Sequence, residues 1–386
     1  MTEAADLAPI REAVRALCAD FPGGYWRALD RERAYPDKFV AALTKAGFLA
    51  ALIPEEYGGS GLTMTAAAAI MEEIQATGCN GAACHAQMYT MGTVLRHGSA
   101  AQKARYLPGI ARGELRLQAF GVTEPTSGTD TLGLRTTAVR DGNDAYVVNG
   151  QKIWTSRAQH SDLMLLLART TPREQAKKRT DGLSVFLVDM REVKGNGLTI
   201  RPIRTMMNHA TTEVFFENMR VPAENLIGKE GEGFRYIISG MNAERILIGA
   251  ECVGDAKWFI QKATAYAGER VVFGRPIGQN QGVQFPIARA YIGMRAAELM
   301  VREAAALYEA GADCGAEANM AKQIAAEASW AAADMCVQTH GGFGFAEEFD
   351  IERKFRETRL YTVAPISTNL VLSYIAEHVL GLPRSY

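Results

Sequence analysis

The sequence predicts an α+β protein in which the strands are clustered in the middle of the chain and helices occupy both ends. Apolar residues recur at helical spacing in residues 1–114 and again in residues 229–386. Residues 115–228 instead consist of short β-branched or apolar runs separated by turn residues. We therefore expect three domains with these boundaries. Because the strands do not alternate with helices, a doubly wound dinucleotide-binding fold is not expected.

The N-terminal zone predicts a series of helices. In DLAPIREAVRALCADF (6–21) the apolar residues fall on one helical face. The segment PDKFVAALTKAGF (36–48) begins with proline and ends near glycine, as helices often do. Further helices are expected in 62–78, 81–96 and 100–114.

The middle zone predicts a β-domain. Turn sequences such as DGND (141–144) and KGNG (194–197) separate its apolar runs. The basic stretch TPREQAKKRT (171–180) has no interleaved aromatic residues, so we expect a solvated loop and not a nucleic-acid surface. The expected strands are LRLQAFGVTE, TTAVRD, AYVVNGQKIWTS, LMLLLART, LSVFLVDM, LTIRPIRT and TEVFFENMRV.

The C-terminal zone returns to long helices from about residue 231. The helical pattern is clearest in the alanine-rich stretches 255–268, 290–309 and 317–337. Neither an internal repeat nor a low-complexity tract interrupts it. The predicted order along the whole chain is therefore helices, strands and helices.

Composition and charge exclude several classes of protein. The 386 residues carry a net charge of −1, so no global field attracts nucleic acid or an anionic membrane. Residues 1–20 contain no signal-peptide apolar run and no 18-residue apolar stretch exists, so we expect a cytoplasmic protein. The cysteines form no CxxC pair or Cys/His cluster, so we expect reduced, buried thiols and no metal. They are Cys18, Cys79, Cys84, Cys252, Cys314 and Cys336.

Two motifs in the middle zone indicate a ligand site. FGVTEPTSGTD (120–130) predicts a strand that runs into a hydroxyl-rich loop, which can present polar groups to a ring edge or a pyrophosphate. GQKIWTS (150–156) ends a predicted strand on an aromatic residue beside two hydroxyls. A core tryptophan is the structural alternative. The glycine runs GGSG (58–61) and HGGFG (340–344) match no phosphate-binding motif and by themselves indicate turns or a helix C-cap.

Five segments together resemble the acyl-CoA dehydrogenase family. PEEYGGSGL, FGVTEPTSGTD, NGQKIWTS, RVVFGRPIGQNQGVQF and QTHGGFGF occur in the expected order over nearly the whole chain. The resemblance implies an N-terminal α-helical domain, a middle β-barrel-like domain and a C-terminal four-helix bundle. It also implies bound FAD, an acyl-CoA substrate, an electron-transfer flavoprotein as acceptor and a homotetramer built as a dimer of dimers.

The resemblance also implies which residues contact FAD. Without it, Arg270 would be read as a surface salt-bridge residue, although a guanidinium is well suited to pyrophosphate. Serine and threonine at 367–368 are also good N-cap residues for the final helix, and the two roles are compatible. The implied flavin contacts within one chain are Phe120, Val122, Thr123, Thr129, Trp154, Thr155, Ser156, Ser367, Thr368 and Asn369. Those toward the FAD of a neighbouring subunit are Arg270, Phe273, Gln281, Gln338, Gly341 and Gly342.

The family's usual catalytic base is missing from its usual position. Many relatives carry a glutamate in a loop near the C-terminus, and the matching segment here is YTVAPISTN (361–369), in which Pro365 occupies that position. The resemblance implies that a backbone N–H at this position binds the thioester carbonyl, but proline has no N–H. Three alternatives follow: a neighbouring N–H such as that of Ile366 replaces it, the loop is offset by one residue, or carbonyl activation is weaker.

Glu244 is the candidate base. It interrupts the apolar stripe of the predicted helix 233–254, where Ile237, Met241 and Ile248 share its face. Desolvation on such a face raises the pKa of a carboxyl group, as a base working near neutral pH requires. The alternative is a surface glutamate paired with an arginine. The isovaleryl-CoA and long-chain branches of the family place their base on this helix before an arginine, as in Glu244-Arg245.

The expected function is α,β-dehydrogenation of an acyl-CoA to a trans-2-enoyl-CoA, with a straight or branched acyl group. The resemblance assigns substrate contacts to Thr129, Asn242, Arg245 and Pro365. Three rival functions use the same scaffold: a non-redox acyl-CoA lyase such as a desulfinase, an FAD-dependent oxidase, and a non-catalytic binding subunit. His85 and His340 are interpreted as structural histidines.

Overall fold

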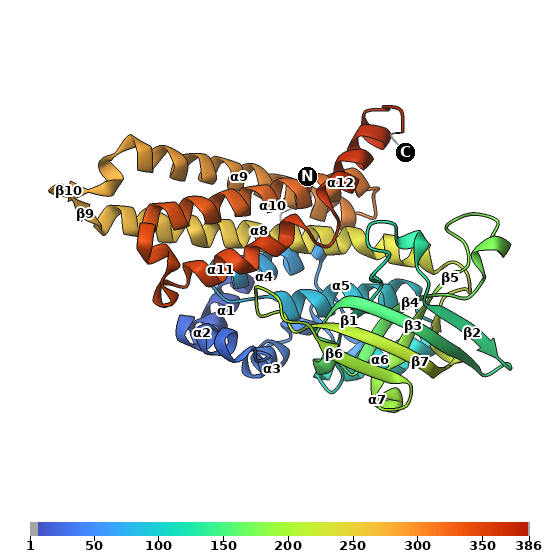
Figure 1. Ribbon diagram of the computed structural model, residues 1–386. Coiled ribbons are helices and arrows are strands. Elements are labelled where there is room, and N and C mark those ends of the chain that lie inside the picture. Colours follow the sequence, from blue (N-terminus) through green and yellow to red (C-terminus); the bar gives the residue numbers. More distant parts are fainter. Residues whose placement is uncertain (1–6, 385–386) are drawn as a thin grey trace. The chain divides into compact units, whose positions relative to one another are not determined.

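The computed structural model describes residues 7–384. The predicted order of helices, strands and helices is confirmed (Figure 1). The three domain boundaries stay a prediction, and their outer ends at residues 1 and 386 lie outside the described residues. The helices are α1 (Ala8–Ala19), α2 (Gly23–Glu32), α3 (Asp37–Lys45), α4 (Met64–Ala76), α5 (Ala82–His97), α6 (Ala100–Arg112), α7 (Met190–Val193), α8 (Gly233–Glu269), α9 (Gln281–Glu309), α10 (Gly315–His340), α11 (Ile351–Thr358) and α12 (Thr368–Tyr374).

The backbone contacts divide the chain into two compact units. The helical unit comprises Met1–Glu32, Thr63–Gly81 and Asn242–Tyr386, and the sheet unit comprises Arg33–Leu62 and Ala82–Met241. The strands are β1 (Leu117–Gly121), β2 (Thr137–Asp141), β3 (Ala145–Ser156), β4 (Leu163–Arg169), β5 (Leu183–Asp189), β6 (Leu198–Pro202), β7 (Thr211–Pro222), β8 (Leu226–Ile227), β9 (Val271–Val272) and β10 (Arg275–Pro276).

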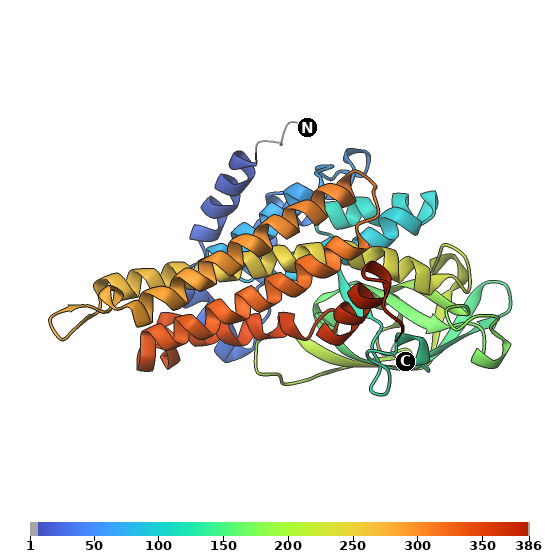
Figure 2. The same cartoon turned by 90° about the horizontal axis from the view of Figure 1, so that it is seen from above.

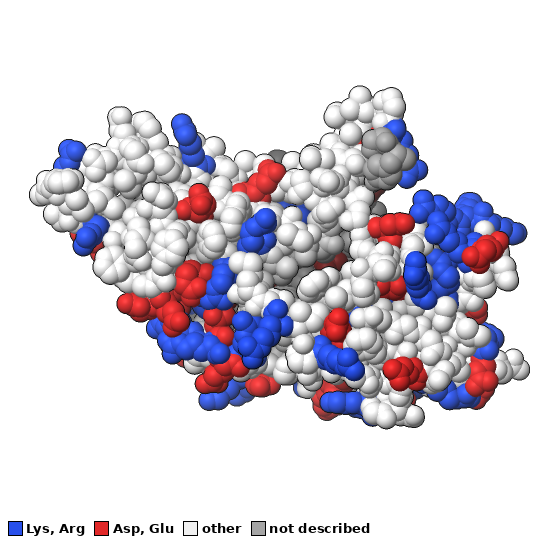
Figure 3. All heavy atoms as spheres, in the orientation of Figure 1, with Lys and Arg blue, Asp and Glu red and all other residues white. Residues whose placement is uncertain are grey.

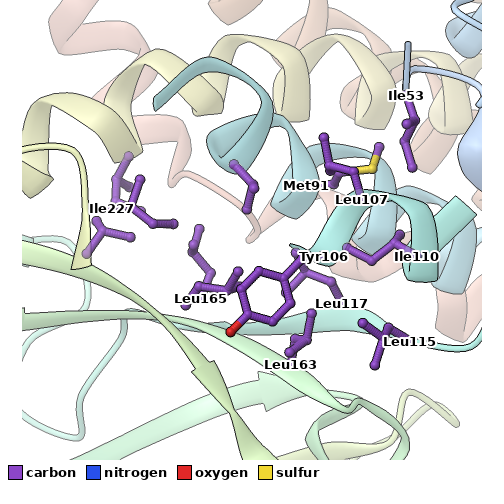
Figure 4. Close-up of a cluster of buried hydrophobic side chains, with 14 of the residues drawn as sticks. Ile53, Met91, Tyr106, Leu107, Ile110, Leu115, Leu117, Leu163, Leu165 and Ile227 are labelled. Atoms are coloured by element: carbon purple, nitrogen blue, oxygen red, sulfur yellow. The ribbon is translucent and has the colours of Figure 1, made fainter. Parts of the chain in front are cut away.

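The sheet unit is built on a sheet with the strand order β6-β7-β3-β2-β4-β5-β8, with β1 parallel to β4. Strand β4 is buried along its whole length, because its successive side chains enter two different cores. Leu163 and Leu165 face the core formed with helices α5 and α6, where Tyr106 and Leu107 pack (Figure 4). Leu166 points the other way, into the core on the opposite face.

The helical unit is dominated by α8, α9 and α10, which run side by side in both views (Figure 1, Figure 2). A glycine lets these helices approach closely. A Cβ atom at Gly249 of α8 would lie 2.8 Å from a methyl carbon of Val301 on α9 and 3.5 Å from the carbonyl oxygen of Ala321 on α10. Because the first distance is shorter than van der Waals contact, only glycine fits without a shift.

Acidic and basic side chains lie together on the face shown in Figure 3, as expected for a chain with a net charge of −1. All six cysteines are buried and free. Within residues 7–384, no helix combines the length and hydropathy that a membrane span requires.

Candidate active site

Glu244 lies on α8 and is buried. The helix runs without interruption for 37 residues, and the apolar residues that follow Glu244 are buried too, among them Ile246 and Leu247. The side chain of Glu244 is only 6% exposed, as its apolar stripe predicted. In the described part of the chain, no cation lies within ion-pair distance of its carboxylate. Burial therefore raises the pKa of Glu244 to about 8, although the charge of Arg245 acts in the opposite direction.

Arg245 and Asn242 form a small polar cluster beside Glu244. The Nη1 group of Arg245 donates a hydrogen bond of 2.9 Å to Oδ1 of Asn242, and Nδ2 of Asn242 lies 3.7 Å from the sulfur of Cys314. Arg245 is 7% exposed, and its Nε meets no acceptor among the described residues. Desolvation lowers the pKa of Arg245, while the charge of Glu244 raises it. A buried guanidinium with a spare donor is suited to binding a polar group of a substrate.

The loop that contains Pro365 is anchored at both ends. Tyr361 is buried, and its hydroxyl accepts a hydrogen bond of 3.1 Å from Nε2 of Gln75 on α4. At the other end, Ser367 is the N-cap of α12, and its hydroxyl accepts from the backbone N–H of Leu370 at 3.4 Å. The predicted capping role of Ser367 is therefore confirmed. The two anchors hold the backbone between them, including Pro365.

In the sheet unit, the two middle-zone motifs lie next to each other. The backbone N–H of Ile153 donates to the carbonyl of Thr123 at 2.9 Å. Trp154, next along β3, has a φ of 61° and is 57% exposed. A bulky residue in the left-handed region is uncommon, and the strain indicates a functional constraint on this aromatic ring. Oγ1 of Thr155 is buried and has no hydrogen-bond partner among the described residues.

A buried ion pair joins these motifs. Lys152 is 0% exposed, and its Nζ contacts the carbonyl oxygen of Val122 at 3.0 Å and Oε1 of Glu124 at 2.8 Å. Glu124 also accepts the backbone N–H groups of Arg135 and Thr136, at 2.6 and 2.9 Å. Burial lowers the pKa of Lys152 to about 8, although Glu124 raises it. The pair fixes the start of the loop 122–130 against β3.

The remaining candidates of the sheet unit lie on β1, on the loop that follows it and at the end of β3. Phe120 and Val122 are half-buried and pack against the core shown in Figure 4, whereas Thr129 lies exposed at the end of the loop. Ser156 is half-buried at the end of β3. All four of these residues, like the two motifs 120–130 and 150–156, therefore lie on β1, on β3 or on the loop that follows β1.

A pocket of about 590 Å³ lies in the helical unit and contains four of the residues that the resemblance assigned to FAD. Gly341 ends α10 with a φ of 57°. A Cβ atom at Gly341 or Gly342 would meet no heavy atom within 4 Å, so the space before both glycines is open. Phe273 is fully exposed outside the pocket lining, and Gln281 begins α9. The four predicted residues in the lining are Arg270, Gln338, Gly341 and Gly342.

Sequence reasoning missed the burial of Lys152 and Lys322, two of the three lysines that are 0% exposed among the described residues. Lys152 lies in a strand pattern that gives no sign of an inward-facing charge. Lys322 lies in an alanine-rich helix, and its nearest carboxylates in sequence, Glu317 and Glu327, are not at a spacing that pairs on a helix.

The structural role of His85 and His340 stays an interpretation. Burial lowers the pKa of His85 to about 3, and Nδ1 of His340 lies 2.8 Å from the carbonyl oxygen of Cys336. Among the described residues, no cluster of three or more His, Cys, Asp or Glu side chains could hold a metal ion.

Comparison with known proteins assigns all three parts of the chain to one family. Three family models match it, and each describes one domain of acyl-CoA dehydrogenases. The N-terminal domain matches residues 5–114, the middle domain residues 119–219 and the C-terminal domain residues 231–380.

Individual proteins match over almost their whole length. "Acyl-CoA dehydrogenase FadE12" of Mycobacterium tuberculosis is 36% identical over 380 residues, which cover 98% of this chain and 96% of that protein. The structure of a glutaryl-coenzyme A dehydrogenase in complex with glutaryl-CoA superimposes with a TM-score of 0.91 at 30% identity, covering 100% of this chain and 98% of that one. A structure described as the electron transferring flavoprotein of Acidaminococcus fermentans has a TM-score of 0.92 at 29% identity, with coverage of 98% and 99%.

Proposed function

This chain belongs to the acyl-CoA dehydrogenase family of oxidoreductases, and from this premise we propose that it oxidises the Cα–Cβ bond of an acyl-CoA to a trans-2-enoyl-CoA, with Glu244 as the general base. The observation that carries the assignment of the base is the burial of Glu244 without a cationic partner. A carboxyl group with a pKa of about 8 is a stronger base than an ordinary carboxylate, and its ionised, proton-accepting fraction increases as pH rises toward 8.

The C-terminal loop supports the same assignment by exclusion. Pro365 offers no side-chain acceptor, and the stretch from Tyr361 to Asn369 contains no acid. Glu244 therefore takes the proton from the α-carbon. The adjacent Asn242–Arg245 cluster supplies donors for polar parts of the thioester substrate, with Arg245 offering its unused Nε. Thr129 and Pro365 are further proposed substrate contacts.

We propose FAD as the cofactor, and the residues present fit it. When bound, FAD supplies a hydride acceptor at N5 for the β-hydrogen. In the sheet unit, Trp154 offers an exposed aromatic face and Thr155 a buried hydroxyl without a partner. The backbone at 120–123, Ser156 and Thr129 complete this part of the proposed site. In the helical unit, residues 367–369 are proposed as separate flavin contacts.

The pocket on the helical unit is proposed to hold part of the FAD of a neighbouring subunit. Its guanidinium, amide and open glycine backbone suit phosphate and ribose oxygens. The nearby hairpin and α9 expose large apolar side chains, including Phe273 at 101%, Ile292 at 66% and Leu299 at 60%. Such exposure supports burial by a second copy of the chain. We therefore propose a homotetramer built as a dimer of dimers, in which Phe273 and Gln281 contact the neighbour's cofactor.

Electrons are proposed to pass to an electron-transfer flavoprotein, and the chain is proposed to work in the cytoplasm. The similarity to a structure described as such a flavoprotein accords with the first point.

Anaerobic mixing of the FAD-loaded protein with straight and branched acyl-CoAs tests the function. We expect the visible flavin absorbance to bleach with at least one thioester, and the product to be the 2-enoyl-CoA by mass spectrometry. Conversion of a thioester without bleaching would identify a non-redox lyase. Oxygen consumption in the absence of another acceptor would identify an oxidase. Glu303, exposed on α9, provides a control: Glu303→Gln should bleach like the wild type, and Glu244→Gln should not.

A further inference from the structure

Removal of an α-proton moves negative charge onto the thioester oxygen, so a donor must be directed at that oxygen. Pro365 cannot provide a backbone N–H at its own position. Another group of the 361–369 loop must therefore donate to the thioester oxygen. The inference that follows rests on the proposed dehydrogenase function.

Lys322 on α10 holds the loop immediately after Pro365. The residue is 0% exposed, and its Nζ donates a hydrogen bond of 3.0 Å to the carbonyl oxygen of Ile366. No carboxylate of the described residues forms an ion pair with Lys322, so the carbonyl is its one hydrogen-bonding partner there. Desolvation lowers the pKa of this lysine, and the charge of Arg245 lowers it further. Burying an ammonium group for a single backbone contact is costly, which indicates that the contact has a function.

The hydrogen bond from Lys322 fixes the orientation of the whole peptide between Ile366 and Ser367, and not only the position of its carbonyl oxygen. The carbonyl of Ile366 and the N–H of Ser367 belong to the same peptide unit, which is trans and planar. With the oxygen directed at Lys322, the N–H of Ser367 must point to the opposite side. Donation from a cationic group to the carbonyl also polarises the peptide, and this strengthens its N–H as a donor.

The N–H of Ser367 is available for a ligand. It donates no hydrogen bond within the part of the chain that the structure describes, and the Ser367 hydroxyl is already engaged with the N–H of Leu370. The φ of Ser367 is −66°, held by its position as N-cap of α12. The orientation of this peptide is therefore set by Lys322 on its carbonyl side and by the N-cap conformation of Ser367 on the other.

We propose that the N–H of Ser367 is the backbone donor to the thioester oxygen, and that Lys322 is the positioning residue that orients and polarises its peptide. The N–H replaces the donor that Pro365 removes. The proton leaves the α-carbon for Glu244, and the charge that develops on the thioester oxygen is met by this N–H.

The test compares two substitutions at one position. Ser367→Pro removes the N–H and tolerates the observed φ. Ser367→Ala keeps the N–H and removes the hydroxyl, which caps α12 and belongs to a proposed flavin contact, so FAD content is measured in both variants. Both are made in the FAD-loaded Glu244→Gln protein, so that an acyl-CoA labelled with ¹³C at its thioester carbonyl stays intact. The infrared band of the bound carbonyl is then compared with that of the free thioester.

We expect the bound carbonyl band to lie at lower wavenumber than the free band, to keep that shift in Ser367→Ala and to lose most of it in Ser367→Pro. Lys322→Met should reduce the shift with FAD still bound. With Glu244 intact, Ser367→Pro should lower kcat by about 10²–10³-fold with little change in KM. Flavin absorbance and thermal unfolding check that each variant is folded.

The proposal is wrong if the carbonyl band of the bound thioester keeps its shift in Ser367→Pro. It is also wrong if that shift is lost in Ile366→Pro and in no other variant. If Ser367→Pro does not fold, replacing Ser367 by the corresponding α-hydroxy acid removes the same N–H without a ring, and the same two outcomes apply. Failure of the proposed function is distinguishable, because it appears as absence of flavin bleaching in the wild type.

Discussion

Replacing Glu244 by glutamine should make the stability of the protein less dependent on pH. The carboxyl group has an ordinary pKa of 4.5, and burial raises it to about 8 in the folded protein. Between these values the folded chain binds a proton that the unfolded chain has released. Unfolding therefore becomes easier as pH rises, and the stability that the protonated carboxyl group contributes is lost progressively from about pH 4.5 to about pH 8.

The size of this pH-dependent change in the free energy of unfolding follows from the pKa shift of Glu244. One pH unit corresponds to about 1.4 kcal/mol, so the wild type should lose about 3 kcal/mol relative to Glu244→Gln from about pH 5.5 to about pH 7.5. The difference should level off above about pH 8. Urea unfolding of both FAD-loaded proteins at equal concentration, at each pH, measures it. The amide itself adds an offset that does not vary with pH, so the slope is the quantity to compare.

If the free energies of unfolding of the wild type and of Glu244→Gln changed with pH in the same way, the reasoning would be refuted. Such a result would show that Glu244 has the same pKa in the folded and unfolded chains. The same variant should lose at least about 10²-fold in turnover while retaining FAD. In the wild type, kcat/KM should rise about tenfold per pH unit below about pH 8 and then level off, as the free enzyme loses the proton of its base. A profile that is flat across this range would assign the base to another group.

Two further substitutions test other parts of the site. Lys152→Met leaves Glu124 buried without its cation and should destabilise the protein by about 3–5 kcal/mol in thermal or urea unfolding. Lys178→Met, on the exposed 171–180 loop, should change stability little. Equal effects of the two would contradict the importance of the buried pair. Arg270→Ala should weaken FAD binding in equilibrium titration, whereas Arg275→Ala, on the same hairpin but outside the pocket lining, should not. Unchanged affinity in the Arg270 variant would remove that pocket from the cofactor site.

Much of the fold could be predicted from the sequence alone, because secondary structure follows from local patterns. The change from helical spacing to short β-branched runs placed the sheet in the middle of the chain. The apolar stripe around Glu244 predicted a buried carboxylate, and the structure shows it at 6% exposure. Ser367 before an apolar helix predicted an N-cap for the same local reason. Pro365, together with the absence of any acid between Tyr361 and Asn369, excludes a carboxylate base from that loop on sequence alone.

Only the tertiary structure decided which distant groups meet. Lys152 and Glu124 are 28 residues apart, and Lys322 is 44 residues from Ile366. Nothing in the local pattern of a strand or an alanine-rich helix predicts such partners, because a side-chain period specifies the face that a residue occupies and not what packs against that face. The pocket around Arg270 and Gly341 likewise exists only because two segments far apart in the chain fold together. Burial raises the electrostatic cost of each lysine, and long-range packing supplies the oxygen atoms that offset it.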